Sequence, residues 1–183
     1  MSDLVLGSAS PRRREILQDA GYDFTVVPAI CEEFPCGDLS PVEYVKALAL
    51  AKARDVFARV DKPTLGADTV VVLDGRILGK PANRSVNAQF LKDLSGKSHY
   101  VYTGFAIVKD GLEVVDFDCT EVVFNHLSDD LIKAYVDSGL GLDKAGGYGI
   151  QDGFDLVDKI VGSFNNVVGL PIEKINKLLK ELL

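Results

Sequence analysis

Two turn signals, each lying between apolar runs, constrain the fold of this chain most strongly. Asp74-Gly75 separates the run TLGADTVVVL from RILGKP, and Lys109-Asp110-Gly111 separates longer strand-type runs at 99–108 and 112–125. Asp-Gly pairs favour the tight turns that join neighbouring antiparallel strands. Within the last of these runs, DFDCTEVVF alternates polar and apolar residues, which is typical of a half-buried strand. The sequence therefore predicts antiparallel strand pairs at both places.

Helical segments alternate with these strands. Helix start signals and apolar periodicity predict helices over 11–20, 41–59, 85–94 and 128–137, and a last one from Pro171. The second helix begins with a capping box, Ser40-Pro41-Val42-Glu43. Further strands are expected over 4–7 and 22–28. This alternation, combined with tight strand turns, predicts an α/β fold with a mixed sheet rather than an all-parallel one. A length of 183 residues suits one domain, expected over 1–183.

Composition and charge argue against several classes of protein function. The net charge of −7 argues against a nucleic-acid polymer as partner. No apolar stretch approaches the ~20 residues of a membrane span, and the N-terminus lacks the basic region of a signal peptide. The three cysteines do not form a disulfide framework, so we expect reduced thiols and a cytoplasmic protein without membrane association.

Three arginines follow the helix start Ser10-Pro11, where the positive end of the helix dipole disfavours cations. An anion at this helix N-terminus would turn that repulsion into a shared attraction, since arginine donates two parallel hydrogen bonds to phosphate. Successive helical residues point about 100° apart, so two of the three can face one ligand. We expect Arg12 and Arg13 to do so beside the hydroxyls of Ser8 and Ser10. The alternative is that all three are solvated or pair with nearby acids.

Lys52 and Asp68 are the next anomalies. Lys52 falls on the apolar stripe of its helix, so it either extends to solvent or meets an anion. Asp68 interrupts an apolar strand, where an unpaired charge is costly. It is expected to be a general base or a metal ligand, or else a hydrogen-bonded strand terminus. Glu32, Glu33 and Asp68 could supply the oxygen ligands that Mg²⁺ prefers. Lys80 precedes Pro81, which favours an extended backbone there.

The segments that carry these residues, together with others in the chain, resemble the Maf family of nucleoside triphosphate pyrophosphatases. The similar blocks are collinear from residue 4 to about 175: LVLGSASPRRREIL, ALALAKA, GADTVVVLDGRILGKP, LSGKSHYVYTG, LDKAGGYGIQ and GSFNNVVGLPIEKI. Gly104-Phe105 is a minor departure from the family pattern. The resemblance implies a twisted mixed sheet flanked by helices with a central cleft, similar to the inosine triphosphate pyrophosphatases. It also implies a cytoplasmic homodimer.

The implied reaction is hydrolysis of a nucleoside triphosphate to the monophosphate and pyrophosphate, assisted by Mg²⁺ or Mn²⁺. The family's phosphate-binding motif falls on Ser8, Ser10, Arg12 and Arg13. Its acidic metal position falls on Glu33 and its helix lysine on Lys52. The catalytic aspartate falls on Asp68, as proton acceptor or metal ligand, and the lysine before proline falls on Lys80. Positions linked to substrate choice fall on Arg12, Thr69 and Gln151.

The loop DKAGGYGIQ resembles the family branch that acts on dTTP and UTP. An amide such as Gln151 can donate and accept hydrogen bonds at once, which matches the O4/N3–H edge of uracil or thymine. Three alternatives stay open on the sequence. The substrate could be a modified pyrimidine triphosphate removed before a polymerase misuses it, or the enzyme could be a general phosphate-ester hydrolase. The chain could also be a nucleotide-binding regulator of cell division or septum formation without essential catalysis.

Overall fold

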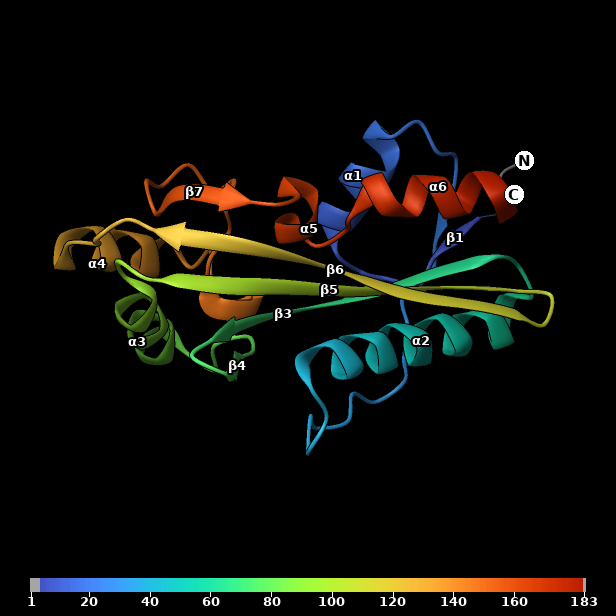
Figure 1. Cartoon of the computed structure of the whole chain (residues 1–183), viewed down its shortest axis with the longest axis horizontal. Coiled ribbons are helices and arrows are strands. Elements are labelled where there is room, and N and C mark those ends of the chain that lie inside the picture. Colours follow the sequence, from blue (N-terminus) through green and yellow to red (C-terminus); the bar gives the residue numbers. More distant parts are fainter. Residues whose placement is uncertain (1–3, 183) are drawn as a thin grey trace. The chain divides into compact units, whose positions relative to one another are not determined.

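The computed structural model describes residues 4–182, which form two compact units. Among these residues, the first unit comprises 4–69, Thr103–Asp118 and 169–182, and the second comprises Val70–Tyr102 and Cys119–Val168. Three long strands contribute residues to both units: β3 (Thr64–Leu73), β5 (Ser98–Lys109) and β6 (Leu112–Phe124) (Figure 1).

The strands form a mixed sheet, as predicted. Their order is β2-β1-β3-β5-β6-β7, with β4 (Arg76–Leu78) paired to β3. The short strands β1 (Val5–Leu6), β2 (Thr25–Val26) and β7 (Val157–Val161) complete it. β1 runs parallel to β2 and β3, whereas β4 is antiparallel to β3 and β7 is antiparallel to β6. Asp74 and Gly75 both adopt positive φ, 49° and 76°, as a tight hairpin turn requires.

The predicted helices are present: α1 (Pro11–Asp19), α2 (Pro41–Val60), α3 (Arg84–Leu94), α4 (Asp129–Ser138) and α6 (Ile172–Leu182). The predicted capping box of α2 is formed by Ser40 and Glu43. Two short elements, α5 (Phe164–Val168) and a 3₁₀ turn at Ala145–Gly147, were not predicted because they are too short to show periodicity. Within the part of the chain that the structure describes, no helix is long and apolar enough to cross a membrane.

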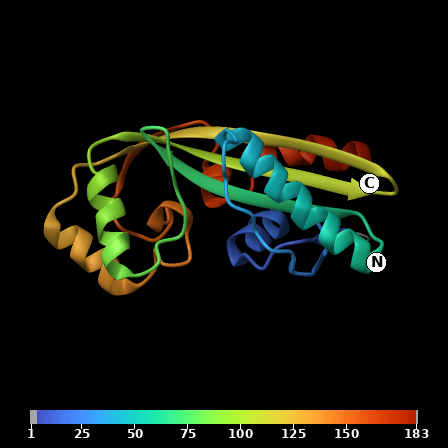
Figure 2. The same cartoon turned by 90° about the horizontal axis from the view of Figure 1, so that it is seen from below.

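In the first unit, helices cover both faces of the strands. α2 lies on one face, and α1 and α6 lie on the other; Figure 2 views the unit from the α2 side. Successive residues of a strand point to opposite faces of the sheet, so alternate residues of β3 face α2 or face α1 and α6. Leu65 and Ala67 join the core beneath α1 and α6, together with Leu17 and Ile175. Gly66 and Asp68 therefore face α2.

α2 packs unusually close to the strands because two glycines face it. A Cβ at Gly66 would lie 2.5 Å from the carbonyl oxygen of Ala49, and one at Gly104 would lie 2.4 Å from that of Val45. Neither distance is possible for a real side chain without movement of the helix. Gly104, which departs from the family pattern in sequence, thus has a packing role here. The close approach also brings the middle of α2 within reach of Asp68.

The substitution Gly66→Ala is expected to destabilise the protein by about 1–3 kcal/mol, because the new methyl group would push backbone against backbone. Urea unfolding would measure the change. Gly79→Ala is the matched control, since the structure describes nothing within 4 Å of a Cβ there. That control is expected to lie within about 0.5 kcal/mol of the original protein. A Gly66→Ala protein of unchanged stability would contradict the close packing.

In the second unit, α3 and α4 lie side by side, and the core gathers around β5, β6 and these helices. Its buried members include Leu91, Val101, Phe124 and Tyr135. His99 is buried among them: its Nε2 lies 2.6 Å from the Tyr148 hydroxyl, and its ring meets Phe124 edge-on at 5.0 Å. Burial lowers the pKa of His99 to about 4.

Acid is therefore expected to weaken the fold through His99. Between pH 6.5 and 4 the unfolded chain protonates this histidine and the folded chain does not. The free energy of unfolding is therefore highest above pH 6.5 and decreases as the pH is lowered toward 4. The expected loss from pH 7 to pH 5 is about 2 kcal/mol. His99→Gln should show a smaller loss in thermal unfolding over the same range. Equal losses in the two proteins would rule out this origin.

Candidate functional site

The first part of the site is the turn between β1 and α1. The parallel register pairs Leu6 with Leu65, and the Gly7 amide donates to the Leu65 carbonyl at 2.8 Å, after which the chain leaves the sheet. Ser10 caps α1 by accepting from the Arg13 amide at 3.4 Å, and its own amide donates to Ser8 Oγ at 3.2 Å. The turn therefore holds both serine hydroxyls at the helix N-terminus.

Arg13 ties this turn to the rest of the first unit. Its guanidinium donates to the Gly169 carbonyl (2.8 Å), Ser8 Oγ (3.2 Å) and Thr69 Oγ1 (3.1 Å). Thr69 in turn lies 2.8 Å from the hydroxyl of Thr103. Burial lowers the pKa of Arg13, and the negative charge of Asp68 opposes that shift. A guanidinium carries five N–H donors, so Arg13 can hold these contacts and still donate to an anion.

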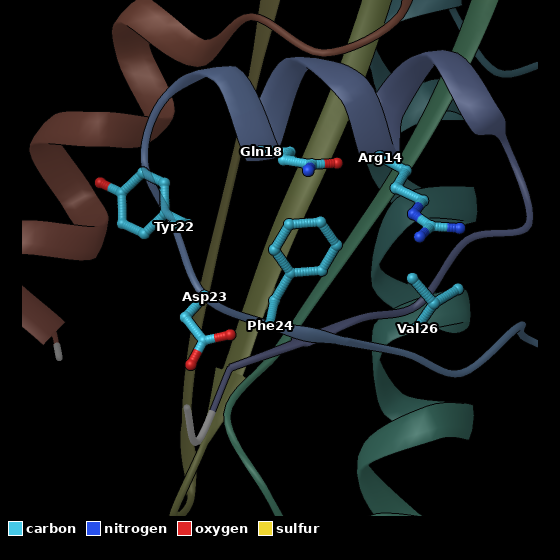
Figure 3. A pocket seen from close by; sticks show the side chains of 6 residues that line it. All are labelled: Arg14, Gln18, Tyr22, Asp23, Phe24 and Val26. Atoms are coloured by element: carbon cyan, nitrogen blue, oxygen red, sulfur yellow. The ribbon is translucent and has the colours of Figure 1, made fainter. Parts of the chain in front are cut away.

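The other two arginines differ in exposure. Arg12 is half-buried, while Arg14 is exposed. Arg14 borders a surface pocket of about 380 Å³ between α1 and the segment 22–26 that follows it (Figure 3). The other residues that line this pocket are Gln18, Tyr22, Asp23, Phe24 and Val26. Arg14 thus borders a pocket whose other lining residues do not include Ser8, Ser10, Arg12 or Arg13.

The second part of the site is a lysine between two carboxylates. Lys52 Nζ lies 2.6 Å from Asp68 Oδ1 and 2.6 Å from Glu33 Oε1. The lysine and aspartate side chains are 15% and 12% exposed, whereas that of Glu33 is 58% exposed. The pairing with Asp68 occurs because α2 lies close to β3. Lys52 therefore meets an anion, and one carboxylate of the group is open to solvent.

Charge attraction and hydrogen bonds hold Lys52, Asp68 and Glu33 together. Burial alone would lower the pKa of Lys52, but the charge of Asp68 and hydrogen bonds to both carboxylates outweigh it, so this pKa is raised. Tyr44, two helical turns before Lys52, lies near the same charges: burial, then Asp68 and Glu33, raises its pKa. The sequence analysis did not identify Tyr44. Its spacing of eight residues from Lys52 on one helix face is the signal that could have done so.

The two carboxylates converge on one cationic position. Among residues 4–182, no group of three or more His, Cys, Asp or Glu side chains is arranged to hold a metal ion. Glu33 and Asp68 nevertheless both lie 2.6 Å from one ammonium nitrogen. Two carboxylates suit Mg²⁺, which commonly takes one or two from the protein and the remaining oxygens from water and phosphate. The donor set thus fits a cation that also binds a phosphate ligand.

Two predicted site residues belong to the second unit. Lys80 is exposed and follows β4, directly before the buried Pro81. Gln151 is exposed in the turn after the 3₁₀ segment, next to Asp152. The Asp152 carboxylate accepts from the Tyr135 hydroxyl at 2.6 Å, and that hydroxyl accepts from the Gly149 amide at 2.9 Å. The structure thus brings the other predicted residues together in the first unit and anchors the Gln151 turn within the second.

Two similar proteins have names that agree with the sequence resemblance. A dTTP/UTP pyrophosphatase of Moorella thermoacetica is 51% identical, covering 98% of this chain and 94% of that protein. A dTTP/UTP pyrophosphatase of Thermococcus gammatolerans is 50% identical over 96% of this chain and 94% of that protein. The solved nucleoside-triphosphatase / dITP/XTP pyrophosphatase of Mycobacterium abscessus aligns with a TM-score of 0.47 and 18% identity, covering 98% and 97% of the two chains.

A family model described as Maf-like protein matches residues 3–182, which is nearly the whole chain. The match includes the Ser8–Arg13 turn and the turn that carries Gln151. It also includes Lys52, Glu33 and Asp68, which together are called the Lys52 group. With this match and relatives at about half identity over almost the full length, the chain belongs to the Maf family.

Proposed function

We propose that this protein hydrolyses dTTP and UTP to the nucleoside monophosphate and pyrophosphate. The observation that carries the proposal is the Lys52 group, in which one ammonium lies 2.6 Å from each of two carboxylates within the unit that also holds the Ser8–Arg13 turn. A binding protein would need the phosphate contacts alone. The names of the relatives at 50–51% identity support dTTP and UTP as substrates. Modified pyrimidine triphosphates are the alternative substrates of the same site.

The Ser8–Arg13 turn is proposed to bind the triphosphate. The hydroxyls of Ser8 and Ser10 and the guanidinium groups of Arg12 and Arg13 all offer donors to phosphate oxygens, at the positive end of the α1 dipole. Their positive charge would stabilise the charge that develops on the leaving pyrophosphate. Because Arg13 is already held by Ser8, Thr69 and Gly169, its guanidinium is positioned before the substrate arrives.

Glu33 and Asp68 are the proposed ligands of a divalent cation, Mg²⁺ or Mn²⁺. When bound, such a cation neutralises phosphate oxygens and makes a bound water more acidic. Binding of a cation here requires that Lys52 release at least part of its contact with the carboxylates. Lys52 can then turn its ammonium toward the phosphates, because its four-carbon stem is flexible and its charge is maintained by a raised pKa.

The chemical step is proposed to take place at the α-phosphorus. Asp68 orients a water and accepts its proton as the water oxygen bonds to that phosphorus. The bond from the α-phosphorus to the bridging oxygen breaks, and pyrophosphate leaves with the electron pair. Asp68 suits this role because the strand fixes its backbone and close packing by α2 limits its exposure.

Family membership supplies the remaining assignments. Lys80 is proposed to neutralise phosphate charge, and Gln151 and Thr69 are proposed to contribute to substrate choice together with Arg12. We also propose that residues 1–183 act as one functional domain, as a homodimer in the cytoplasm.

A product assay tests the proposal. Purified protein with Mn²⁺ or Mg²⁺ is offered a panel of nucleoside triphosphates, including modified pyrimidines, and pyrophosphate and orthophosphate are measured separately. Pyrophosphate from dTTP and UTP, with little from purine nucleotides, is the expected result. Release of orthophosphate would indicate a general phosphate-ester hydrolase. Tight nucleotide binding with no release of pyrophosphate would favour the regulator.

A further inference from the structure

The loop that carries Glu33 is attached to α2 along its whole length. Arg59 donates to the Pro28 carbonyl at 2.7 Å, and Asp55 Oδ2 accepts from the Ile30 amide at 2.9 Å. Further along, Glu33 meets Lys52, and the Tyr44 hydroxyl donates to the Phe34 carbonyl at 2.9 Å. The loop 28–34 thus runs antiparallel to the helix.

The helix positions involved share one face. Arg59, Asp55, Lys52 and Tyr44 are separated by four, three and eight residues, which are the spacings that align side chains on a helix. From Tyr44 to Arg59 the helix rises about 22 Å. The loop contacts this face near both of its ends, at Pro28 and at Phe34, so its course follows the helix.

The two large apolar side chains of the loop are not buried. Ile30 is 72% exposed and Phe34 is 38% exposed. Phe34 makes one edge-on contact with the Tyr44 ring, at 6.0 Å. The position of the Glu33 carboxylate consequently depends on the polar contacts with α2. Those nearest the start of the loop come from Asp55 and Arg59.

Asp55 and Arg59 act as one unit. Arg59 Nη2 donates to Asp55 Oδ2 at 2.9 Å, so the arginine holds the carboxylate that receives the loop amide. The Ile30 amide, opposed by partial burial and assisted by Arg59, lowers the pKa of Asp55. Asp55 therefore remains ionised and in place at neutral pH.

We propose that Asp55, held by Arg59, is a positioning residue that fixes the loop 28–34 along α2 and thereby keeps the Glu33 carboxylate at Lys52 and Asp68. The significance for catalysis rests on the proposed function, in which Glu33 binds the divalent cation. Partners that orient a metal ligand commonly change metal affinity by about 10–100-fold when they are removed.

Asp55→Ala tests this role through two readouts. In metal-free protein, amide hydrogen exchange over 28–36 should accelerate at least about tenfold, while exchange within the middle of α2 stays unchanged. In the dTTP assay, the Mn²⁺ concentration for half-maximal activity should rise about tenfold, with kcat at saturating Mn²⁺ largely retained. Asp55→Asn keeps an acceptor for the Ile30 amide and should restore most of both properties.

Arg54→Ala is the matched control. Arg54 neighbours Asp55 on the same helix but pairs with Glu113 of β6, with Nε to Oε1 and Nη2 to Oε2 both at 2.6 Å. This variant should leave loop exchange and Mn²⁺ dependence unchanged. The proposal would be overturned if Asp55→Ala had the same loop exchange and Mn²⁺ dependence as the unaltered protein. It would also be overturned if Arg54→Ala showed changes as large as those of Asp55→Ala. If the unaltered protein released no pyrophosphate, the proposed function would fail, and hydrogen exchange alone would still decide the role of Asp55.

Discussion

Asp68→Asn is expected to lower kcat for dTTP by about 10³-fold or more while leaving the fold intact. The substitution removes the charge that would accept the proton of the attacking water and bind the cation. The amide has almost the same shape, and its oxygen can still accept from Lys52 Nζ, which lies 2.6 Å from Asp68 Oδ1. Steady-state kinetics with pyrophosphate detection and thermal unfolding together measure the two effects.

Glu113→Gln is the control for the loss of one negative charge. Glu113 is a surface carboxylate that pairs with Arg54, and it should tolerate the same acid-to-amide change with normal kcat. An Asp68→Asn protein with near-original kcat would remove Asp68 from the chemistry. A large fall in its melting temperature would instead assign Asp68 a mainly structural role.

Lys52→Met is expected to have the second largest effect. It should lower the stability of the metal-free protein, and added metal should reverse that loss of stability. Without metal, Asp68 and Glu33 would face each other with no cation between them, and Asp68 is 12% exposed. Removing one partner of a buried pair is strongly destabilising; because this pair is partly solvated, we expect about 2 kcal/mol. Methionine preserves the packing of the lysine stem, so the loss would report on charge.

Divalent cation should reverse that loss of stability. Mn²⁺ would occupy the position between the carboxylates, and a ligand that binds only the folded state stabilises it by mass action. The rise in melting temperature between EDTA and Mn²⁺ should be larger for Lys52→Met than for the unaltered protein. Activity should remain at least about 10²-fold low even with Mn²⁺, because the phosphates lose a cation. No response to Mn²⁺ would contradict a metal site at Glu33 and Asp68.

The strand turns and helix caps made most of the fold predictable. Asp74-Gly75 needs positive φ at both residues, and Ser40 with Glu43 satisfies two backbone donors, so these local signals predicted the antiparallel pair and the start of α2 directly. β1 and β2 are shorter than predicted, because apolar runs do not show where pairing stops. The helix α5 has only five residues, which is too short for its apolar residues to show a helical period. The division into two units leaves no mark in the long strands that both units share.

The candidate site was predictable where a charge conflicted with its surroundings. Lys52 on an apolar stripe and Asp68 in an apolar strand each signalled a partner, and they are partners of each other. What brings them together could not be predicted, since it depends on Gly66 and Gly104 admitting α2 close to the sheet. Tyr44 and Asp55 were missed because polar residues on a helix surface are ordinary until the loop beside them is known.

Hydrolysis in ¹⁸O-labelled water tests the central claim most directly. Purified protein is incubated with dTTP and Mn²⁺ in H₂¹⁸O, and mass spectrometry locates the label in the products. Attack at the α-phosphorus predicts one ¹⁸O atom in dTMP and none in the pyrophosphate. Label in pyrophosphate would place the attack at the β-phosphorus, and label in orthophosphate would place it at the γ-phosphorus. Either of these results would contradict the proposed reaction.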